Sequence, residues 1–185
     1  FLSSPFQKSV PRATRVASAL TKLGPSYVKL GQFLATRADV IGPELSADLR
    51  HLQDKAEPFS MAEAREAVER ALGGKLEDHF VEFGPPVAAA SIAQVHKAYV
   101  LDGGVRKAVA VKILRPNIEK RFNRDLDSYY FAAQMIERFY PPSRRLRPVA
   151  VVDNLKHTTA LEMDLRLEAA AISEMASNTT EDEGF

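Results

Sequence analysis

Apolar and polar residues recur at helical spacing through the first part of the chain, and one dipeptide interrupts the pattern. Gly24-Pro25 separates two helical stretches, because glycine suits the end of a helix and proline suits the first turn of the next. The pattern predicts helices over about residues 11–23 and 25–37. The second helix has an apolar stripe and a separate polar face, namely Tyr27, Leu30 and Leu34 against Lys29, Gln32 and Thr36. We expect the first face to pack and the second to meet polar groups.

The pattern then changes from helical to strand-like spacing. A helix is predicted after Pro43, and Ser60-Met61-Ala62-Glu63 is typical of a capping box that opens a helix ending at Gly73-Gly74. Three strand-like runs follow, with a hairpin turn at Asp102-Gly103-Gly104: residues 80–83, 94–101 and 105–114. The sequence therefore predicts a helical extension over residues 1–72 and a domain over residues 73–185 that contains an antiparallel meander. The fold class is α+β.

Helical spacing returns after Pro116. The apolar positions of this helix are Phe122, Leu126, Tyr129, Ala133 and Ile136. A proline- and arginine-rich linker over residues 141–148 precedes a last helix, predicted over about 149–177, in which Leu161, Leu165 and Ile172 share one face. Glu168 falls on that same face. The final residues, 179–185, are polar and acidic, and we interpret them as a loop cut short.

Composition excludes several classes of function. The chain has 25 basic and 24 acidic residues among 185, so it has no overall field to attract nucleic acid, and we expect no nucleic-acid partner. The absence of cysteine excludes disulfides, thiolate catalysis and cysteine-ligated metals. The four histidines show no ligand spacing, which argues against a metal site built from them alone.

The charge pattern near the start of the chain leaves two interpretations open. Residues 1–38 contain six basic and no acidic side chains, as in a transit peptide or a helix at a membrane surface. A helix face that meets acidic neighbours in the same protein explains the charges equally well. No run approaches the roughly 20 apolar residues that span a bilayer, so we expect no transmembrane segment here.

Lys112 is the first candidate for chemistry. It follows Val109-Ala110-Val111 on the third predicted strand, where a lysine can reach a nucleotide held beneath the loop that joins the first two strands. A carboxylate on an apolar helical face is costly unless it is paired, so we predict an ion pair between Lys112 and Glu168. The alternative is that Glu168 reaches solvent along the rim of its helix.

The loop that joins the first two strands is the second candidate. It runs over residues 84–91 and carries alanine where ordinary kinases carry glycine. Because alanine is restricted to negative φ, this loop should be stiffer than a glycine loop. Its amides and the Ser91 hydroxyl could bind phosphate, but a run of small residues is equally consistent with a tight packing point.

Several motifs, taken in order, resemble those of the UbiB family of atypical protein kinase-like proteins, which is associated with ubiquinone (coenzyme Q) biosynthesis. The chain carries a Lys-x-Gly-Gln signature at residues 29–32 and an alanine-rich loop motif at residues 88–96. It also has a strand lysine at Lys112, followed by Arg115-Pro116. It also carries a Glu-x-Asp motif at Glu162-Met163-Asp164 with Glu168 after it. The resemblance extends over residues 21–172.

The resemblance implies a kinase-like small lobe preceded by the helical Lys-x-Gly-Gln extension, with a role for each motif. Lys112 would orient phosphates and Glu168 would hold Lys112. The loop residues Ala88, Ala89, Ala90 and Ser91 would cover the nucleotide. Lys29 and Gln32 would gate access by meeting Glu162 or Asp164. The alternative for each of these charged residues is a solvated surface position.

The resemblance also implies cofactors, partners and location. The intact protein would bind ATP with Mg²⁺ and act as an ATPase or unorthodox kinase that supports isoprenoid quinone synthesis. Its implied partners are adenine nucleotide, a membrane surface or isoprenoid lipid, quinone-biosynthesis proteins and a second copy in a homodimer. Its implied location is the cytoplasmic face of a bacterial inner membrane or, in a eukaryote, the mitochondrion.

The chain by itself is expected to be inactive. The catalytic aspartate and the magnesium ligands of kinase folds belong to a large lobe, and no such motif precedes Phe185. A second hypothesis is a non-catalytic module, in which the helical extension binds lipid or protein and a degenerate kinase-like lobe serves as a scaffold.

Overall fold

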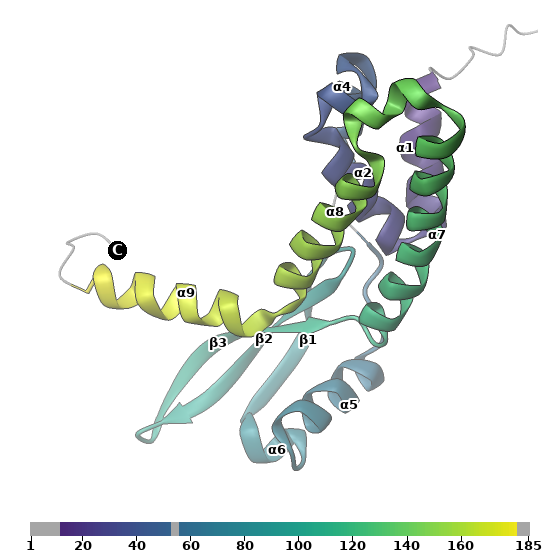
Figure 1. The fold of residues 1–185 in the computed structure, drawn as a ribbon. Helices are drawn as coiled ribbons and strands as arrows, with labels where there is room; N and C mark the ends of the chain where they lie inside the picture. Colours follow the sequence, from purple (N-terminus) through teal and green to yellow (C-terminus); the bar gives the residue numbers. More distant parts are fainter. Residues whose placement is uncertain (1–11, 53–55, 181–185) are drawn as a thin grey trace, which may run out of the picture. The chain divides into compact units, whose positions relative to one another are not determined.

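The computed structural model describes residues 12–52 and 56–180, and it divides the chain into two compact units, Phe1–Lys55 and Ala56–Phe185 (Figure 1). Residues 1–11, 53–55 and 181–185 lie outside the described part. The expectations for the beginning of the basic segment and for the acidic end of the chain therefore concern residues that are not described.

The first unit consists of four helices. They are α1 (Arg12–Leu23), α2 (Pro25–Ala35), α3 (Ala38–Ile41) and α4 (Pro43–Leu49). Gly24 precedes α2 with a φ of 113°, a conformation that glycine adopts without strain, and Pro25 occupies the first turn. The helices predicted on either side of Gly24-Pro25 and after Pro43 are present, whereas the short α3 was not predicted.

The buried face of α2 differs from the predicted stripe. Its buried residues are Ser26, Val28, Gly31 and Ala35, whereas Tyr27, Leu30 and Leu34 are only half-buried. The reason lies at Gly31, where a Cβ atom would overlap a methyl group of Leu52 and lie 2.7 Å from one of Leu20. A glycine carries no apolar weight in a periodicity argument, yet here it marks a position with no room for a side chain unless its neighbours shift.

The second unit begins with a segment over residues 56–60 that leads into α5 (Met61–Leu72) and α6 (Leu76–His79). The predicted capping box is confirmed: the Ser60 hydroxyl accepts from the Glu63 N–H, and the Glu63 carboxylate accepts from the Ser60 N–H at 3.0 Å. One face of α5 packs against the sheet through a cluster of buried residues, namely Ala64, Val68, Leu76 and Ile113. The helix that the sequence placed at the end of the extension thus packs with the sheet, and the compact units divide between Lys55 and Ala56.

The sheet has three antiparallel strands in the order β1-β2-β3, as predicted. Its strands are β1 (Glu82–Ala89), β2 (Ala93–Asp102) and β3 (Val105–Leu114), with Gly103 and Gly104 in the hairpin turn between the last two. The first strand is longer than predicted, because it continues through Pro85-Pro86 with an irregular register there. Proline is tolerated in this way on an edge strand, where one row of N–H groups needs no partner. The loop predicted over residues 84–91 therefore shortens to a turn over residues 90–92.

A helical hairpin follows the sheet (Figure 1). It is formed by α7 (Ile118–Phe139) and α8 (Pro148–Met163), which the 3₁₀ helix η1 (Pro141–Leu146) connects. The predicted apolar positions of α7 are buried as far as Ala133, but Ile136 is 47% exposed. The facing residues of α8 that are buried are Val151, Val152, Leu155 and Thr159.

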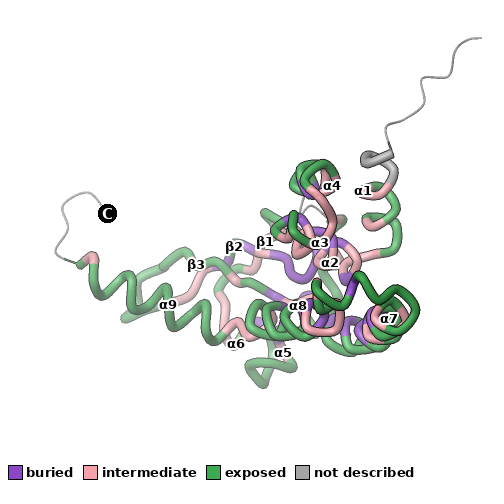
Figure 2. The backbone as a smooth tube through the Cα atoms, turned by 45° about the horizontal axis from the view of Figure 1, so that its top comes forward, coloured by how far each residue is buried: buried purple, intermediate pink, exposed green. Residues whose placement is uncertain are grey.

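The prediction of one helix over residues 149–177 is wrong, because the helix is interrupted at Asp164. Helix α8 ends at Met163, and a separate helix, α9 (Leu165–Asn178), begins immediately after Asp164. The Asp164 carboxylate accepts from the Arg166 N–H at 3.2 Å and so caps the new helix, which is a preferred use of aspartate. No residue of α9 is buried, and Figure 2 shows this helix exposed along its length.

Candidate functional site

Strand β3 and helix α9 bring Lys112 and Glu168 together. The Lys112 Nζ lies 2.5 Å from the Glu168 Oε2, and the side chains are 38% and 47% exposed. The predicted ion pair is therefore present. The helix face that carries Glu168 is not buried as expected, since Ile172 on that face is 63% exposed. An exposed pair of this kind contributes about 0–1 kcal/mol to stability, so its importance lies in where it holds the ammonium group.

Strand alternation explains the direction of Lys112. Ile113 is buried and Val111 packs with it on the face of the sheet that α5 covers. Because successive side chains of a strand point to opposite faces, Lys112 projects from the other face. Helix α9 supplies Glu168 on that face.

The alanine-rich segment forms a tightly packed turn at the end of the same sheet. Ala88 and Ala89 complete β1, and the Ala90 N–H donates to the Ala93 carbonyl at 2.8 Å to close the turn. Ser91 is 3% exposed, and Ile92 packs against Ile118 at the start of α7. The turn is therefore closely packed at Ser91 and Ile92, and phosphate binding by its amides stays a prediction.

Arg115 joins this turn to the segment before α5. Its Nε and Nη2 both donate to the Ala90 carbonyl, at 3.0 and 2.9 Å, and its Nη2 also donates to the Glu57 carbonyl at 2.7 Å. Its backbone N–H donates to the Ile92 carbonyl at 2.9 Å. One residue just beyond β3 thus holds two separate segments of backbone.

A buried network of hydrogen bonds lies next to the turn, on the face of the sheet that α5 covers. The side chain of Gln94 accepts from the Phe59 N–H at 2.9 Å and contacts the His96 Nε2 at 2.8 Å, while the His96 Nδ1 lies 2.9 Å from the Gly84 carbonyl. A carbonyl only accepts, so we assign the ring hydrogen to Nδ1, and Nε2 then accepts from the Gln94 amide. Gln94 and His96 are 1% and 0% exposed, so their partners fix both side chains in place.

The sequence contained a signal for this hydrogen-bonded network. Gln94, His96 and Ala98 alternate along β2 on the face that packs against α5, and two of these inward positions are polar. A polar residue at an inward strand position needs a hydrogen-bond partner, which identifies a buried network. Arg115 follows a strand directly and precedes a proline, but nothing in that pattern indicates which carbonyls it contacts.

The two residues of the Glu-x-Asp motif lie at the junction of α8 and α9. Arg166 donates to both carboxylate oxygens of Asp164 at 2.8 Å, and this hydrogen bonding holds the pKa of Asp164 below its usual value. Lys29 and Gln32 lie on α2 of the first unit. Their expected contact with Glu162 or Asp164 would join the two units and stays a prediction.

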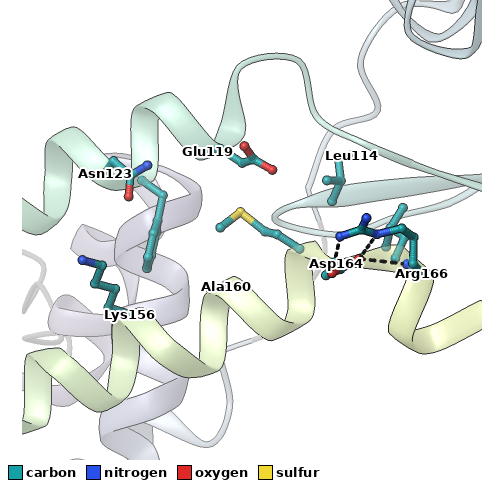
Figure 3. Close-up of a pocket in the computed structure, with 10 residues that line it drawn as sticks. Leu114, Glu119, Asn123, Lys156, Ala160, Asp164 and Arg166 are labelled. Carbon is teal, nitrogen blue, oxygen red and sulfur yellow. Dashed lines mark hydrogen bonds and ion pairs between the residues drawn. The ribbon is translucent and has the colours of Figure 1, made fainter. Parts of the chain in front are cut away.

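A pocket of about 520 Å³ opens at this junction (Figure 3). The Asp164–Arg166 pair lies at one end, Glu119 projects from α7, and Asn123 and Lys156 lie at the other end. The remaining lining residues are apolar, namely Leu114, Phe122, Ala160, Met163 and Leu165. Leu114 projects from the same face of β3 as Lys112, so the pocket and the ion pair share one side of the sheet.

The described residues can also be compared with the expected metal and membrane contacts. Within residues 12–52 and 56–180, no three histidine, aspartate or glutamate side chains gather as a metal site. None of the helices in the described ranges has the length and hydropathy that a bilayer crossing requires.

Comparison with known proteins identifies the family. Residues 51–185 match the ABC1 atypical kinase-like domain. The probable protein kinase UbiB of Marinobacter nauticus is 40% identical over 183 residues, which cover 96% of this chain and 33% of that protein. The probable protein kinases UbiB of Shewanella sp. strain W3-18-1 and Xanthomonas campestris pv. campestris strain B100 are 40% and 42% identical, over 92% and 88% of this chain and 31% and 30% of their own lengths.

The chain thus spans about a third of the length of the curated relatives that it matches. The three-stranded sheet and its helices fit the α+β small lobe of a kinase-like fold. The family suggested by the sequence motifs is confirmed: this chain belongs to the ABC1 family of atypical kinase-like proteins, together with its UbiB relatives.

Proposed function

We propose that this chain supplies the ATP-binding small lobe of an atypical kinase or ATPase that supports ubiquinone biosynthesis at a membrane. The observation that carries this proposal is the ion pair of Lys112 and Glu168 on the sheet face opposite α5. An ammonium group has three N–H donors, and a carboxylate that engages one of them leaves the others for phosphate oxygens. Such a lysine–glutamate pair is the phosphate-orienting element of kinase folds.

The turn after β1 would form the cover of the nucleotide in this proposal. Ala88, Ala89, Ala90 and Ser91 lie where β1 leads into β2, at the end of the sheet to which Lys112 also belongs. Backbone amides in a turn bind phosphate without a charged side chain. Lys29 and Gln32 would control access to the site through Glu162 or Asp164.

The remaining parts of the machinery are proposed for sequence beyond this chain. The matched relatives are about three times as long as the segment that they share with it, which leaves room in them for a large lobe. A catalytic aspartate and Mg²⁺ ligands would come from such a lobe. We therefore expect no ATP turnover from the 185 residues alone.

The links to biology rest on the family. The relatives carry the name probable protein kinase UbiB, which supports a kinase-like activity, and the UbiB family is associated with ubiquinone biosynthesis. Partners in this proposal are an isoprenoid lipid or membrane surface, other quinone-biosynthesis proteins and a second copy of the protein. The location is the membrane that houses quinone synthesis, bacterial or mitochondrial.

The test is ATP binding by the intact protein with Lys112→Met. We expect the Kd for ATP to rise by about tenfold or more, as for the loss of charge-assisted hydrogen bonds to phosphate. Lys107→Met is the matched control, because Lys107 lies on the same strand, 66% exposed, with Asp102 as its partner at 3.7 Å. Equal affinities in the two variants would refute the role of Lys112. If neutralising the basic residues of 1–38 then abolished liposome binding, the scaffold hypothesis would be favoured.

A further inference from the structure

Arg115 follows the strand lysine in the family motif but has no role in the proposed function, yet it contacts the alanine-rich turn directly. Three of its hydrogen bonds reach the turn over residues 90–92, two from the guanidinium and one from its backbone N–H. Another reaches the Glu57 carbonyl. The same region is joined a second time, because the Ala56 N–H donates to the Ala89 carbonyl at 3.3 Å.

The convergence of two guanidinium donors on one carbonyl fixes a peptide plane. A trans peptide is planar, so its N–H points opposite to its C=O. With the Ala90 carbonyl turned toward Arg115, the N–H of Ser91 must point away from Arg115. The orientation of this amide is therefore set by Arg115, which lies three residues beyond Lys112.

The surroundings of Arg115 keep its guanidinium in one place. Phe59 lies with its ring centroid 5.7 Å from the guanidinium carbon, within the range of a cation–π contact. Arg115 is half-buried. Ile92, within the turn that Arg115 holds, packs against Ile118 of α7. A planar group with several donors in a fixed fork can serve two carbonyls at once, which a lysine ammonium on a flexible stem does poorly.

We propose that Arg115 is a positioning residue for the nucleotide: by holding the Ala90 carbonyl it fixes the conformation of the turn over residues 90–92 that covers the phosphates. This inference rests on the proposed function, because it assumes that the turn covers ATP. Arg115 itself is directed at backbone carbonyls and takes no part in phosphoryl transfer. Its effect on ATP passes entirely through the conformation of the turn.

The experiment combines amide hydrogen exchange without nucleotide and ATP affinity, both measured on the intact protein. In Arg115→Ala we expect faster exchange in residues 90–93 and a Kd for ATP raised by about tenfold or more, the effect of losing a charge-assisted hydrogen bond. Arg115→Lys keeps the charge but not the fork, so it should give the same changes to a smaller extent.

Two controls separate positioning from general destabilisation. Arg106→Ala removes an arginine from the other end of β3, where it pairs with Glu82, and should alter neither readout. Val68→Ala removes core volume between α5 and the sheet and should lower the unfolding temperature without changing ATP affinity. If Arg115→Ala fails to fold, Arg115→Lys carries the test, with slow exchange in α7 as evidence that its lobe is folded.

The outcomes distinguish this inference from the function beneath it. A wild-type protein that binds no ATP would refute the proposed function and the inference together. If the wild type binds ATP and the Arg115 variants bind it equally well, the inference alone is refuted, whether or not exchange in the turn is faster. Faster exchange together with weaker binding, absent in both controls, is the result that supports it.

Discussion

At the scale of single residues, Glu168 forms an ion pair that contributes little to stability but could orient Lys112. Its carboxylate lies 2.5 Å from the Lys112 ammonium, but both groups are exposed enough for water to screen the attraction. Helix α9 has no buried residue that would compensate for the entropy of holding the pair. The pair therefore acts chiefly by fixing the direction of Lys112.

Glu168→Gln in the intact protein should weaken ATP binding and leave the unfolding temperature almost unchanged. The amide keeps the shape of the side chain but not its charge, so Lys112 loses its orienting partner, whereas stability changes by no more than about 1 kcal/mol. Titration with ATP and thermal unfolding measure the two effects. Glu174→Gln, on the same exposed helix, is the control. Unaltered ATP affinity in Glu168→Gln would argue against an orienting role.

Gly31 is a residue of the Lys-x-Gly-Gln motif whose role is visible in packing. A Cβ atom there would meet Leu20 and Leu52, whose terminal methyl groups can shift by a small amount. Gly31→Ala should be nearly neutral, because about 1 kcal/mol gained in helix propensity offsets the cost of shifting these two leucine side chains. Gly31→Val should destabilise the protein by about 1–3 kcal/mol, as expected for overpacking. Chemical unfolding of both variants measures this, and a Val variant as stable as the wild type would show that the site is loosely packed.

At the scale of elements, the α7–α8 hairpin contains a hydrogen bond between side chains that is lost when its tyrosine donor deprotonates at high pH. The Tyr130 hydroxyl donates to Asp153 at 2.7 Å, and this bond to a carboxylate raises the pKa of Tyr130 to about 12. Because the pKa is higher in the folded state than the ordinary value of 10.0, the bond stabilises the hairpin fully below pH 10. That contribution is lost as the pH rises toward about 12.

The Tyr130→Phe variant should be less stable than the wild type near neutral pH, because it lacks the hydrogen bond to Asp153. The difference in unfolding free energy should shrink as the pH rises above 10. Ultraviolet titration of tyrosinate should also lose the late component that Tyr130 contributes near pH 12. A stability difference that stays constant across this pH range, with the late component retained, would contradict the assignment of Tyr130.

The elements also show what a sequence can and cannot indicate. Strand β3 and the box at Ser60 were predictable because turn glycines and a capping residue are local signals. The break at Asp164 was not, since apolar spacing continues through it and only the cap reveals a second helix. The extension of β1 through two prolines was also missed, because a proline in a strand is allowed only by an edge position that tertiary structure decides.

The candidate site follows the same division. Lys112 and Glu168 were predictable as a pair, since each is a charge that benefits from the other, although the burial expected at Glu168 was wrong. The contacts of Arg115 were not predictable, because they end on backbone carbonyls that any sequence provides. Motifs therefore indicated the candidate residues, and the structure adds Arg115, the residue that holds the turn in place.

At the scale of the whole molecule, family membership and fold agree. The ABC1 kinase-like match begins at residue 51 and the second compact unit begins at Ala56, so the matched domain and the sheet-containing unit nearly coincide. That unit carries Lys112, Glu168, the alanine-rich turn and Arg115, whereas Lys29 and Gln32 belong to the other. The central claim is that Lys112 in this lobe contacts the phosphates of ATP.

Labelling of the intact protein with an acyl-phosphate derivative of ATP, followed by mass spectrometry, tests this claim most directly, because the reagent transfers its acyl group to a lysine beside the bound phosphates. We predict acylation at Lys112 that excess ATP suppresses, with only slow, ATP-insensitive acylation at Lys107 on the same strand. Equal acylation of the two lysines, unaffected by ATP, would contradict the account.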